Sequence, residues 1–215
     1  MKLVIGDKNY SSWSMRPWVL MTHFGIPFEE VLIELGESAT KDSILAFSAS
    51  GKVPCLVTDE GFAVWDSLAI AETLAERFPQ HALWPRDANA RARARSVSAE
   101  MHSSFTDLRT NMTMAIRTSK PGGGATPGTL ADIARIEALW SACLEACGGP
   151  FLFGDFTIAD AMYAPVVMRF NTYAPKLSAQ AAAYAARMTA EPAVAAWIEA
   201  ARKETHRIEH DEPDA

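Results

Sequence analysis

The sequence is short of cysteine, of long apolar runs and of positive charge, and each shortage excludes a class of protein. Three cysteines in 215 residues cannot form a disulfide framework, and their odd number is typical of a chain in a reducing compartment. No stretch approaches the roughly 18 apolar residues that cross a bilayer, so no membrane span is expected. Residues 1–13 lack the apolar segment of a secretion signal, which favours a cytoplasmic protein.

The charge balance argues against nucleic acid as the main partner, because the net charge is −6 at pH 7. One basic run, residues 86–95, places Arg91 and Arg95 on one face of an expected helix. We interpret that face as solvated, with a phosphate-binding patch as the alternative.

Two pairs of residues have the spacing of metal ligands, but neither pair predicts a metal site. Cys143 and Cys147 stand four apart on an expected helix, with no histidine within several residues. His206 and His210 lie in the polar C-terminal segment 206–215, which we expect to be frayed. We interpret the cysteines as small core or surface residues and the histidines as solvated.

Hydrophobic residues make up 49% of the chain, enough for a sizeable core, and the first 80 residues alternate between strand and helix patterns. Strands are expected at 2–5, 28–35, 53–58 and 62–65, and helices after the loop 10–14, at 41–49 and at 68–78. A helical crossover makes the first two strands parallel, and the turn at 59–61 makes the last two antiparallel. This βαβαββα order predicts a small mixed sheet with helices on both faces, as in thioredoxin.

The rest of the chain, residues 86–215, carries no strand signal and predicts an all-helical domain. Helices are expected at 88–118, 129–147, 157–174, 177–190 and 193–205, with a Gly- and Pro-rich loop at 120–128. Thr157 and Asp160 have the spacing of a capping box, in which each side chain satisfies a backbone N–H of the other residue. The fold class is therefore α/β for residues 1–80 followed by all-α.

Hydroxyl groups gather in the loop 10–14, between the first strand and the first helix. Ser11, Ser12 and Ser14 stand at a helix N-terminus, where free N–H groups and the helix dipole favour negative charge and lower the pKa of a thiol. For Ser14 itself, a helix cap is the favoured interpretation. The sequence has no GxSxG motif and no His/Asp partner near these serines, so a hydrolase-type serine nucleophile is not expected.

Two further segments carry groups that suit a small peptide ligand. A cis bond between Val53 and Pro54 would turn the Val53 backbone outward to pair with an extended peptide, whereas an ordinary edge proline is the alternative. At the start of the helix 68–78, Ser67 could hold a carboxylate and Asp66 an ammonium group, as an amino-acid zwitterion requires. A plain N-cap explains either residue alone.

The segments SSWSMR, GKVPCL and WDSLAI, followed in the helical half by FTIAD, together resemble the glutathione transferase family over residues 1 to about 205. The resemblance implies a serine-type, theta- or zeta-like member: a cytosolic homodimer that uses glutathione as co-substrate. It assigns the thiolate-stabilising role to Ser12, with Ser11 as the alternative, and Arg16 as the arginine of the Ser-x-x-x-Arg pattern. It also implies that the Val53–Pro54 bond is cis and that glutathione is held by Lys52, Val53, Pro54, Asp66, Ser67 and Lys41.

The expected activity is transfer of glutathione to a small apolar electrophile, in a pocket lined by Trp13, Met112 and Met114. Trp13 stands where zeta-like members carry cysteine, which weakens a maleylacetoacetate isomerase assignment. Asp66 stands where the family usually has Glu or Gln. The alternatives are a non-catalytic glutathione-binding or protein-interaction module and a glutathione-dependent isomerase.

Overall fold

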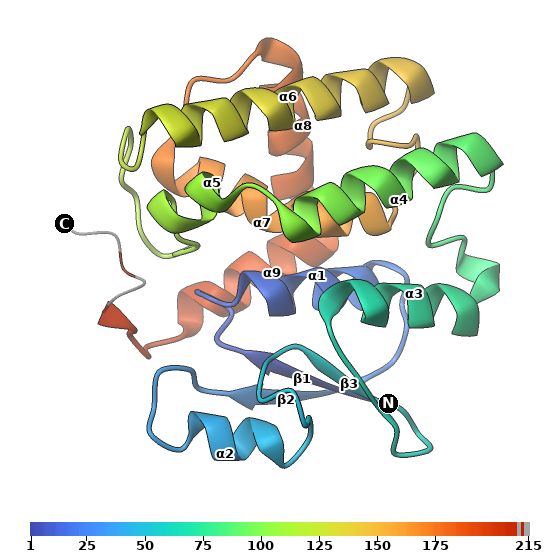
Figure 1. Cartoon of the computed structure of the whole chain (residues 1–215), viewed down its shortest axis with the longest axis vertical. Helices are drawn as coiled ribbons and strands as arrows, with labels where there is room; N and C mark the ends of the chain where they lie inside the picture. Colours follow the sequence, from blue (N-terminus) through green and yellow to red (C-terminus); the bar gives the residue numbers. More distant parts are fainter. Residues whose placement is uncertain (210–211, 213–215) are drawn as a thin grey trace.

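The computed structural model describes residues 1–209 and 212, and it has two parts: a sheet with helices on both faces, and a helical half (Figure 1). The sheet contains β1 (Lys2–Gly6), β2 (Glu29–Ile33), β3 (Cys55–Val57) and β4 (Ala63–Val64), in the order β2-β1-β3-β4. β1 and β2 are parallel, whereas β1/β3 and β3/β4 are antiparallel. The expected βαβαββα order is confirmed.

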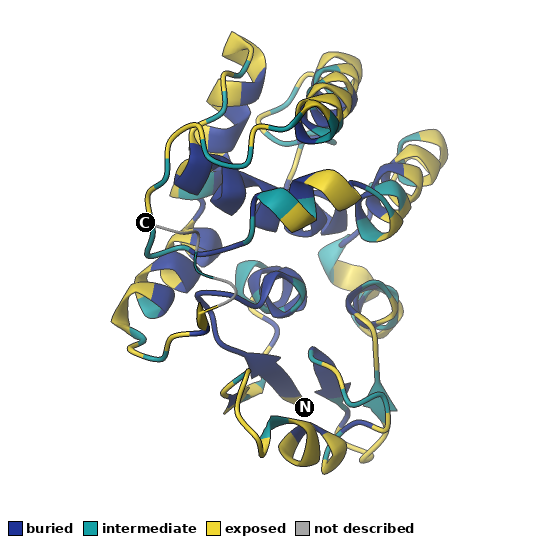
Figure 2. Ribbon diagram, turned by 60° about the vertical axis from the view of Figure 1, so that its left-hand side comes forward, coloured by how far each residue is buried: buried dark blue, intermediate teal, exposed yellow. Residues whose placement is uncertain are grey.

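The apolar run of β1 explains why this sheet is covered on both faces. Leu3 and Ile5 pack on one face into the large core, whereas Val4 packs on the other with Cys55 and Ile44. Helices α1 (Ser12–His23) and α3 (Ser67–Arg77) cover the first face, and α2 (Thr40–Leu45) covers the second (Figure 1). The outer side of α2 is exposed (Figure 2).

The helical half contains α4 (Ala88–Ser103), α5 (Thr106–Asn111), α6 (Pro127–Cys147), α7 (Ile158–Tyr173), α8 (Ala179–Ala190) and α9 (Pro192–Lys203), preceded by a short 3₁₀ helix, η1 (Pro79–His81). α7 is buried along nearly its whole length, because it packs against α1, α4 and α8. The two halves therefore share one continuous hydrophobic core. No helix in the described residues is long and apolar enough to span a bilayer.

The single helix expected over 88–118 is wrong. α4 ends at Ser103, and Phe105 adopts a left-handed conformation (φ 64°) before α5 begins. The Phe105 ring is buried in the core, so the chain breaks its helix where this side chain turns inward. Residues 112–126, between α5 and α6, form no helix.

The expectation of a frayed C-terminal segment is wrong for residues 206–209 and 212. Ile208 is buried and packs with Tyr10 and Leu35, and a ring nitrogen of His206 lies 2.9 Å from the carbonyl oxygen of Leu35. One apolar residue in a polar segment was too weak a signal to predict this packing. His210, the other member of the expected histidine pair, lies outside the described residues.

The capping box at the start of α7 is confirmed. The buried Asp160 carboxylate accepts hydrogen bonds from the backbone N–H groups of Thr157 (2.9 Å) and Leu152 (3.1 Å) and from the hydroxyl of Tyr184 (2.9 Å). Burial raises the pKa of Asp160 to about 6, against these hydrogen bonds, which lower it. Asp160 thus joins α7, α8 and the loop before α7.

Replacing Asp160 with alanine should lower the free energy of unfolding by about 3 kcal/mol, because several buried donors lose their acceptor together. Asp87→Ala is the matched control: Asp87 caps α4 in an exposed position, so its loss should cost about 1 kcal/mol. Urea unfolding followed by circular dichroism measures both. Equal losses for the two variants would contradict the role assigned to Asp160.

Candidate functional site

A pocket of about 290 Å³ lies where the sheet half meets α4. Its lining comes from four places in the chain: α1, the segment before β3, the segment before α3, and α4. The lining residues are Trp13, Ser50, Lys52, Val53, Pro54, Trp65, Asp66 and His102. Four residues predicted to bind a ligand, Lys52, Val53, Pro54 and Asp66, are therefore brought together.

The Val53–Pro54 bond is cis, as expected. Within the described part of the chain, neither the N–H nor the carbonyl of Val53 has a hydrogen-bond partner. The turn before it is fixed by Ser50, whose hydroxyl accepts from the backbone N–H of Lys52 at 3.1 Å. Val53 thus presents an unpaired backbone donor and acceptor at the pocket.

Asp66 caps α3 and also contacts the helical half. One of its oxygens accepts from the N–H of Leu68 at 3.0 Å, and the other lies 2.6 Å from Nε2 of His102. Partial burial raises the pKa of the Asp66 carboxyl, but the hydrogen bond and charge of His102, together with the backbone N–H groups of Leu68 and Ala69, lower it below its usual value. The next hydroxyl, that of Ser67, is buried and has no partner among the described residues.

The serines before and within α1 divide into two roles. Ser11 donates its hydroxyl proton to Oγ of Ser14 at 2.8 Å, and Oγ of Ser14 also accepts from the N–H of Gly6 at 3.1 Å. Ser14 therefore ties α1 to the end of β1, and the interpretation of Ser14 as a helix cap is wrong. Ser12 opens α1, and its hydroxyl makes no hydrogen bond within residues 1–209 and 212. Of the two candidates, Ser12 has the available hydroxyl.

Several of the residues named from the sequence do not line the pocket. The pocket wall does not include Ser11, Ser12 or Ser67, although Ser12 and Ser67 are next to the lining residues Trp13 and Asp66 in the chain. Lys41 is exposed in the first turn of α2. Met112 and Met114 are 1% and 2% exposed and belong to the core, so their expected place in the pocket wall is wrong. Because the helix ends at Ser103, the chain carries both methionines away from the pocket.

Positive charge gathers around Trp13. The guanidinium carbons of Arg16 and Arg109 lie 4.1 Å and 4.9 Å from the centre of the Trp13 ring. Arg16 is 1% exposed, and among the described residues its two terminal nitrogens have no hydrogen-bond partner. Burial, and then the charges of Arg109 and Arg169, lower the pKa of Arg16 well below its usual value. The pocket wall is therefore backed by a buried cation that contacts no counter-ion among the residues that the structure describes.

His102 and Arg109 are the site residues that the sequence did not reveal. His102 is 36 residues from Asp66, and no motif links the two. Their contact depends on how α4 packs against the sheet half, which no local pattern specifies. None of the three cysteines lines the pocket, and burial raises the pKa of Cys143 to about 11. No group of three or more potential metal ligands occurs in the described residues.

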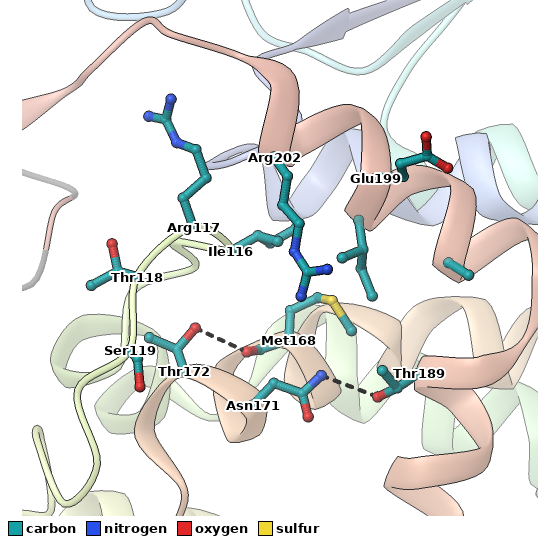
Figure 3. A pocket seen from close by; sticks show the side chains of 12 residues that line it. Ile116, Arg117, Thr118, Ser119, Met168, Asn171, Thr172, Thr189, Glu199 and Arg202 are labelled. Atoms are coloured by element: carbon teal, nitrogen blue, oxygen red, sulfur yellow. Dashed lines mark hydrogen bonds between the residues drawn. The ribbon is translucent and has the colours of Figure 1, made fainter.

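A larger cavity, of about 800 Å³, lies between α7, α9 and residues 116–119 (Figure 3). None of the predicted site residues lines it. Met168 and Arg202 point into it, whereas Arg117 turns away from it (Figure 3). The smaller pocket is therefore the candidate site, because it brings together Lys52, Val53, Pro54 and Asp66, and the larger cavity contains none of the predicted binding residues.

Comparisons with known proteins give the same family for both halves. The model of the glutathione S-transferase N-terminal domain matches residues 10–77, and that of the C-terminal domain matches residues 117–200. A solved maleyl pyruvate isomerase, described as a bacterial glutathione S-transferase of the zeta class, shares the fold with a TM-score of 0.72 at 24% identity, covering 96% of this chain and 100% of its own. A Burkholderia glutathione transferase homologue with bound glutathione has a TM-score of 0.71 at 24% identity, covering 94% and 97%.

Among curated proteins, a probable maleylacetoacetate isomerase from Caenorhabditis elegans is 29% identical over 171 residues, 78% of each chain. A maleylacetoacetate isomerase from Pseudomonas aeruginosa is 35% identical over 102 residues, which is 46% of this chain and less than half of that relative. With the thioredoxin-like sheet, the helical half and both domain models in agreement, the chain belongs to the glutathione S-transferase family.

Proposed function

We propose that this protein binds glutathione in the pocket beside Trp13 and activates its thiol for addition to an electron-poor carbon of a small unsaturated acid. The observation that supports this most directly is the set of polar groups left without partners around one pocket. These are the Ser12 hydroxyl, the Val53 backbone and the Ser67 hydroxyl, all among the described residues. A ligand can complete the hydrogen bonds of these groups, and the buried Ser67 hydroxyl has no other partner among the described residues.

The proposed glutathione pose follows from those groups. The cysteinyl backbone pairs with Val53 as an added strand, beside Lys52 and Pro54. The γ-glutamyl carboxylate lies at the N-terminus of α3, where Ser67 donates, and its ammonium group meets Asp66. We also propose that Lys41 contacts the glycine carboxylate, although no residue of α2 lines the pocket.

The thiol is then held near Ser12, at the N-terminus of α1. A hydroxyl donor and a helix N-terminus both favour the thiolate over the thiol. The buried charge of Arg16 and that of Arg109 act in the same direction, since positive charge lowers the pKa of a nearby thiol. The thiolate is the nucleophile, so the site raises its concentration and fixes its position.

The same charges favour an anionic electrophile over a neutral one. A buried guanidinium without a counter-ion is stabilised when an acid binds nearby. The curated relatives are named for maleylacetoacetate and maleylpyruvate, which agrees with an acidic substrate. Transfer of glutathione to a small neutral electrophile is the second candidate, supported by the aromatic lining of Trp13 and Trp65.

The reaction type is tested with the purified protein, glutathione and either maleylpyruvate or a reactive aryl halide. We expect turnover of the maleyl acid to its trans isomer with the glutathione concentration unchanged, because addition followed by elimination regenerates the thiol. Consumption of glutathione with the aryl halide alone would favour the transferase. Saturable glutathione binding without turnover of either compound would contradict catalysis and favour a binding module.

Replacing Ser12 with alanine should raise the pKa of the bound glutathione thiol by about one to two units, since a hydrogen bond to a charged group contributes about 1.5–3 kcal/mol. Ultraviolet absorbance of the thiolate against pH measures this. Turnover should fall while glutathione affinity changes little. Ser11→Ala is the control, because the Ser11 hydroxyl donates to Ser14; a larger shift in Ser11→Ala would transfer the role to Ser11.

Ser67→Ala should weaken glutathione binding by about tenfold or more, through loss of a hydrogen bond to a carboxylate. Ser98 provides a matched control, since its hydroxyl is also buried without a partner among the described residues, but, unlike Ser67, it has no chain neighbour that lines the pocket. Isothermal titration calorimetry compares the two variants. Unchanged affinity in Ser67→Ala would remove this residue from the site.

A homodimer in the cytoplasm remains part of the proposal, because the family resemblance implies it. Light scattering coupled to gel filtration gives the mass in solution, and a mass of one chain would contradict the dimer.

A further inference from the structure

The loop between β1 and α1, residues 7–11, is polar yet buried. Asp7, Lys8, Asn9 and Ser11 are all buried, with Asn9 fully shielded from solvent. Buried backbone groups must find hydrogen-bond partners, and a loop has no ladder to supply them. Some of the partners lie within the loop itself or on residues 116–117, and others come from the C-terminal end of the described chain.

Glu204, the residue directly after α9, accepts from two consecutive backbone groups of this loop. Its carboxylate oxygens lie 2.8 Å from the nitrogen of Lys8 and 2.9 Å from that of Asn9. On the other side of the same stretch, the indole N–H of Trp197, in α9, donates to the carbonyl of Lys8 at 2.9 Å. α9 and the residue after it therefore fix both the donors and an acceptor of the loop backbone.

Arg117 joins the C-terminal segment to the same loop. Its backbone N–H donates to the Asn9 side chain at 2.8 Å, and its guanidinium donates to the carbonyls of Glu204 and, at 2.6 Å, of His206. The guanidinium also lies 3.1 Å from the hydroxyl of Tyr10. This explains why the Arg117 side chain turns away from the large cavity (Figure 3).

The loop in turn sets the position of Ser12. The N–H of Ser11 donates to the carbonyl of Asp7 at 2.8 Å, and the N–H of Ser12 donates to the carbonyl of Tyr10 at 2.9 Å. The backbone that carries Ser12 is thus built on the residues that Glu204 holds. A change of about 1 Å in the position of a reacting group can lower a rate a hundredfold.

We propose that Glu204 is a positioning residue for Ser12: its carboxylate, bridging the N–H groups of Lys8 and Asn9, holds the loop that places the Ser12 hydroxyl at the pocket. The inference rests on the proposed function, in which Ser12 donates to the glutathione thiolate. It assigns to Glu204 and the residues after it a part in catalysis, although none of the described ones lines the pocket.

The test is Glu204→Gln. An amide has one acceptor oxygen, and its NH₂ group faces a donor, so one of the two N–H groups loses its partner. Glu199→Gln is the matched control, because Glu199 lies on α9, is 72% exposed and pairs only with Lys203 among the described residues. The readouts are the pKa of the bound glutathione thiol, kcat, KM and glutathione affinity.

For Glu204→Gln we expect the thiol pKa to rise and kcat to fall by about tenfold to a hundredfold, with glutathione affinity nearly unchanged. Glu199→Gln should match the wild type. In the double variant with Ser12→Ala, the shift in thiol pKa should be no larger than that of Ser12→Ala alone, because both changes remove the same interaction.

A thiol pKa that is unchanged in Glu204→Gln, or shifts that add in the double variant, would overturn this inference while leaving the proposed function intact. An unchanged thiol pKa in Ser12→Ala would instead reject the proposed role of Ser12. If Glu204→Gln does not fold, Glu204→Asp carries the same test, because it keeps the carboxylate but is one methylene too short to bridge the N–H groups of Lys8 and Asn9. The same readouts and the same outcomes then apply.

Discussion

The structure depends on a buried polar loop that satisfies only some of its own hydrogen bonds. Residues 7–11 leave β1 and enter α1 in the interior, where water does not replace missing partners. Glu204, Trp197 and Arg117 provide those partners from the helical half. The two halves are therefore connected by hydrogen bonds as well as by the shared apolar core, and the connection lies next to the helix that carries Ser12.

The site itself is formed by groups that the fold leaves unpaired. Val53 keeps a free backbone N–H and carbonyl among the described residues, while Ser67 keeps a buried hydroxyl and Arg16 two buried nitrogens. The buried ones, on Ser67 and Arg16, destabilise an empty protein, because each has lost its water without gaining a partner. Unlike the unpaired polar groups elsewhere in the core, they lie beside residues that line a pocket. The charges near Trp13 add a preference for anionic species, the thiolate included.

Much of the sheet half could be predicted, because its signals are local. The apolar run of β1 needed cover on both faces, the turn at 59–61 produced a hairpin, and Asp66 had the position of an N-cap. The capping box at Thr157 and Asp160 was equally local. In each case, residues within a few positions of each other determine the geometry.

The features that were missed depend on contacts between residues far apart in the sequence. His102 meets Asp66, and Glu204 meets Lys8, only after the helices have packed. The break at Phe105 has a similar cause, since a buried ring rather than a helix-breaking residue ends the helix. Met112 and Met114 were misplaced for the same reason: a continuous helix would have carried them along the pocket.

The central claim is that glutathione lies along Val53 with its sulfur at the hydroxyl of Ser12. A crystal structure of the protein with glutathione tests it most directly. The account predicts paired hydrogen bonds between the cysteinyl backbone and Val53, and the sulfur within hydrogen-bonding distance of Oγ of Ser12. Glutathione bound in the large cavity beside Met168, or bound at Val53 with its sulfur turned away from both Ser11 and Ser12, would contradict it.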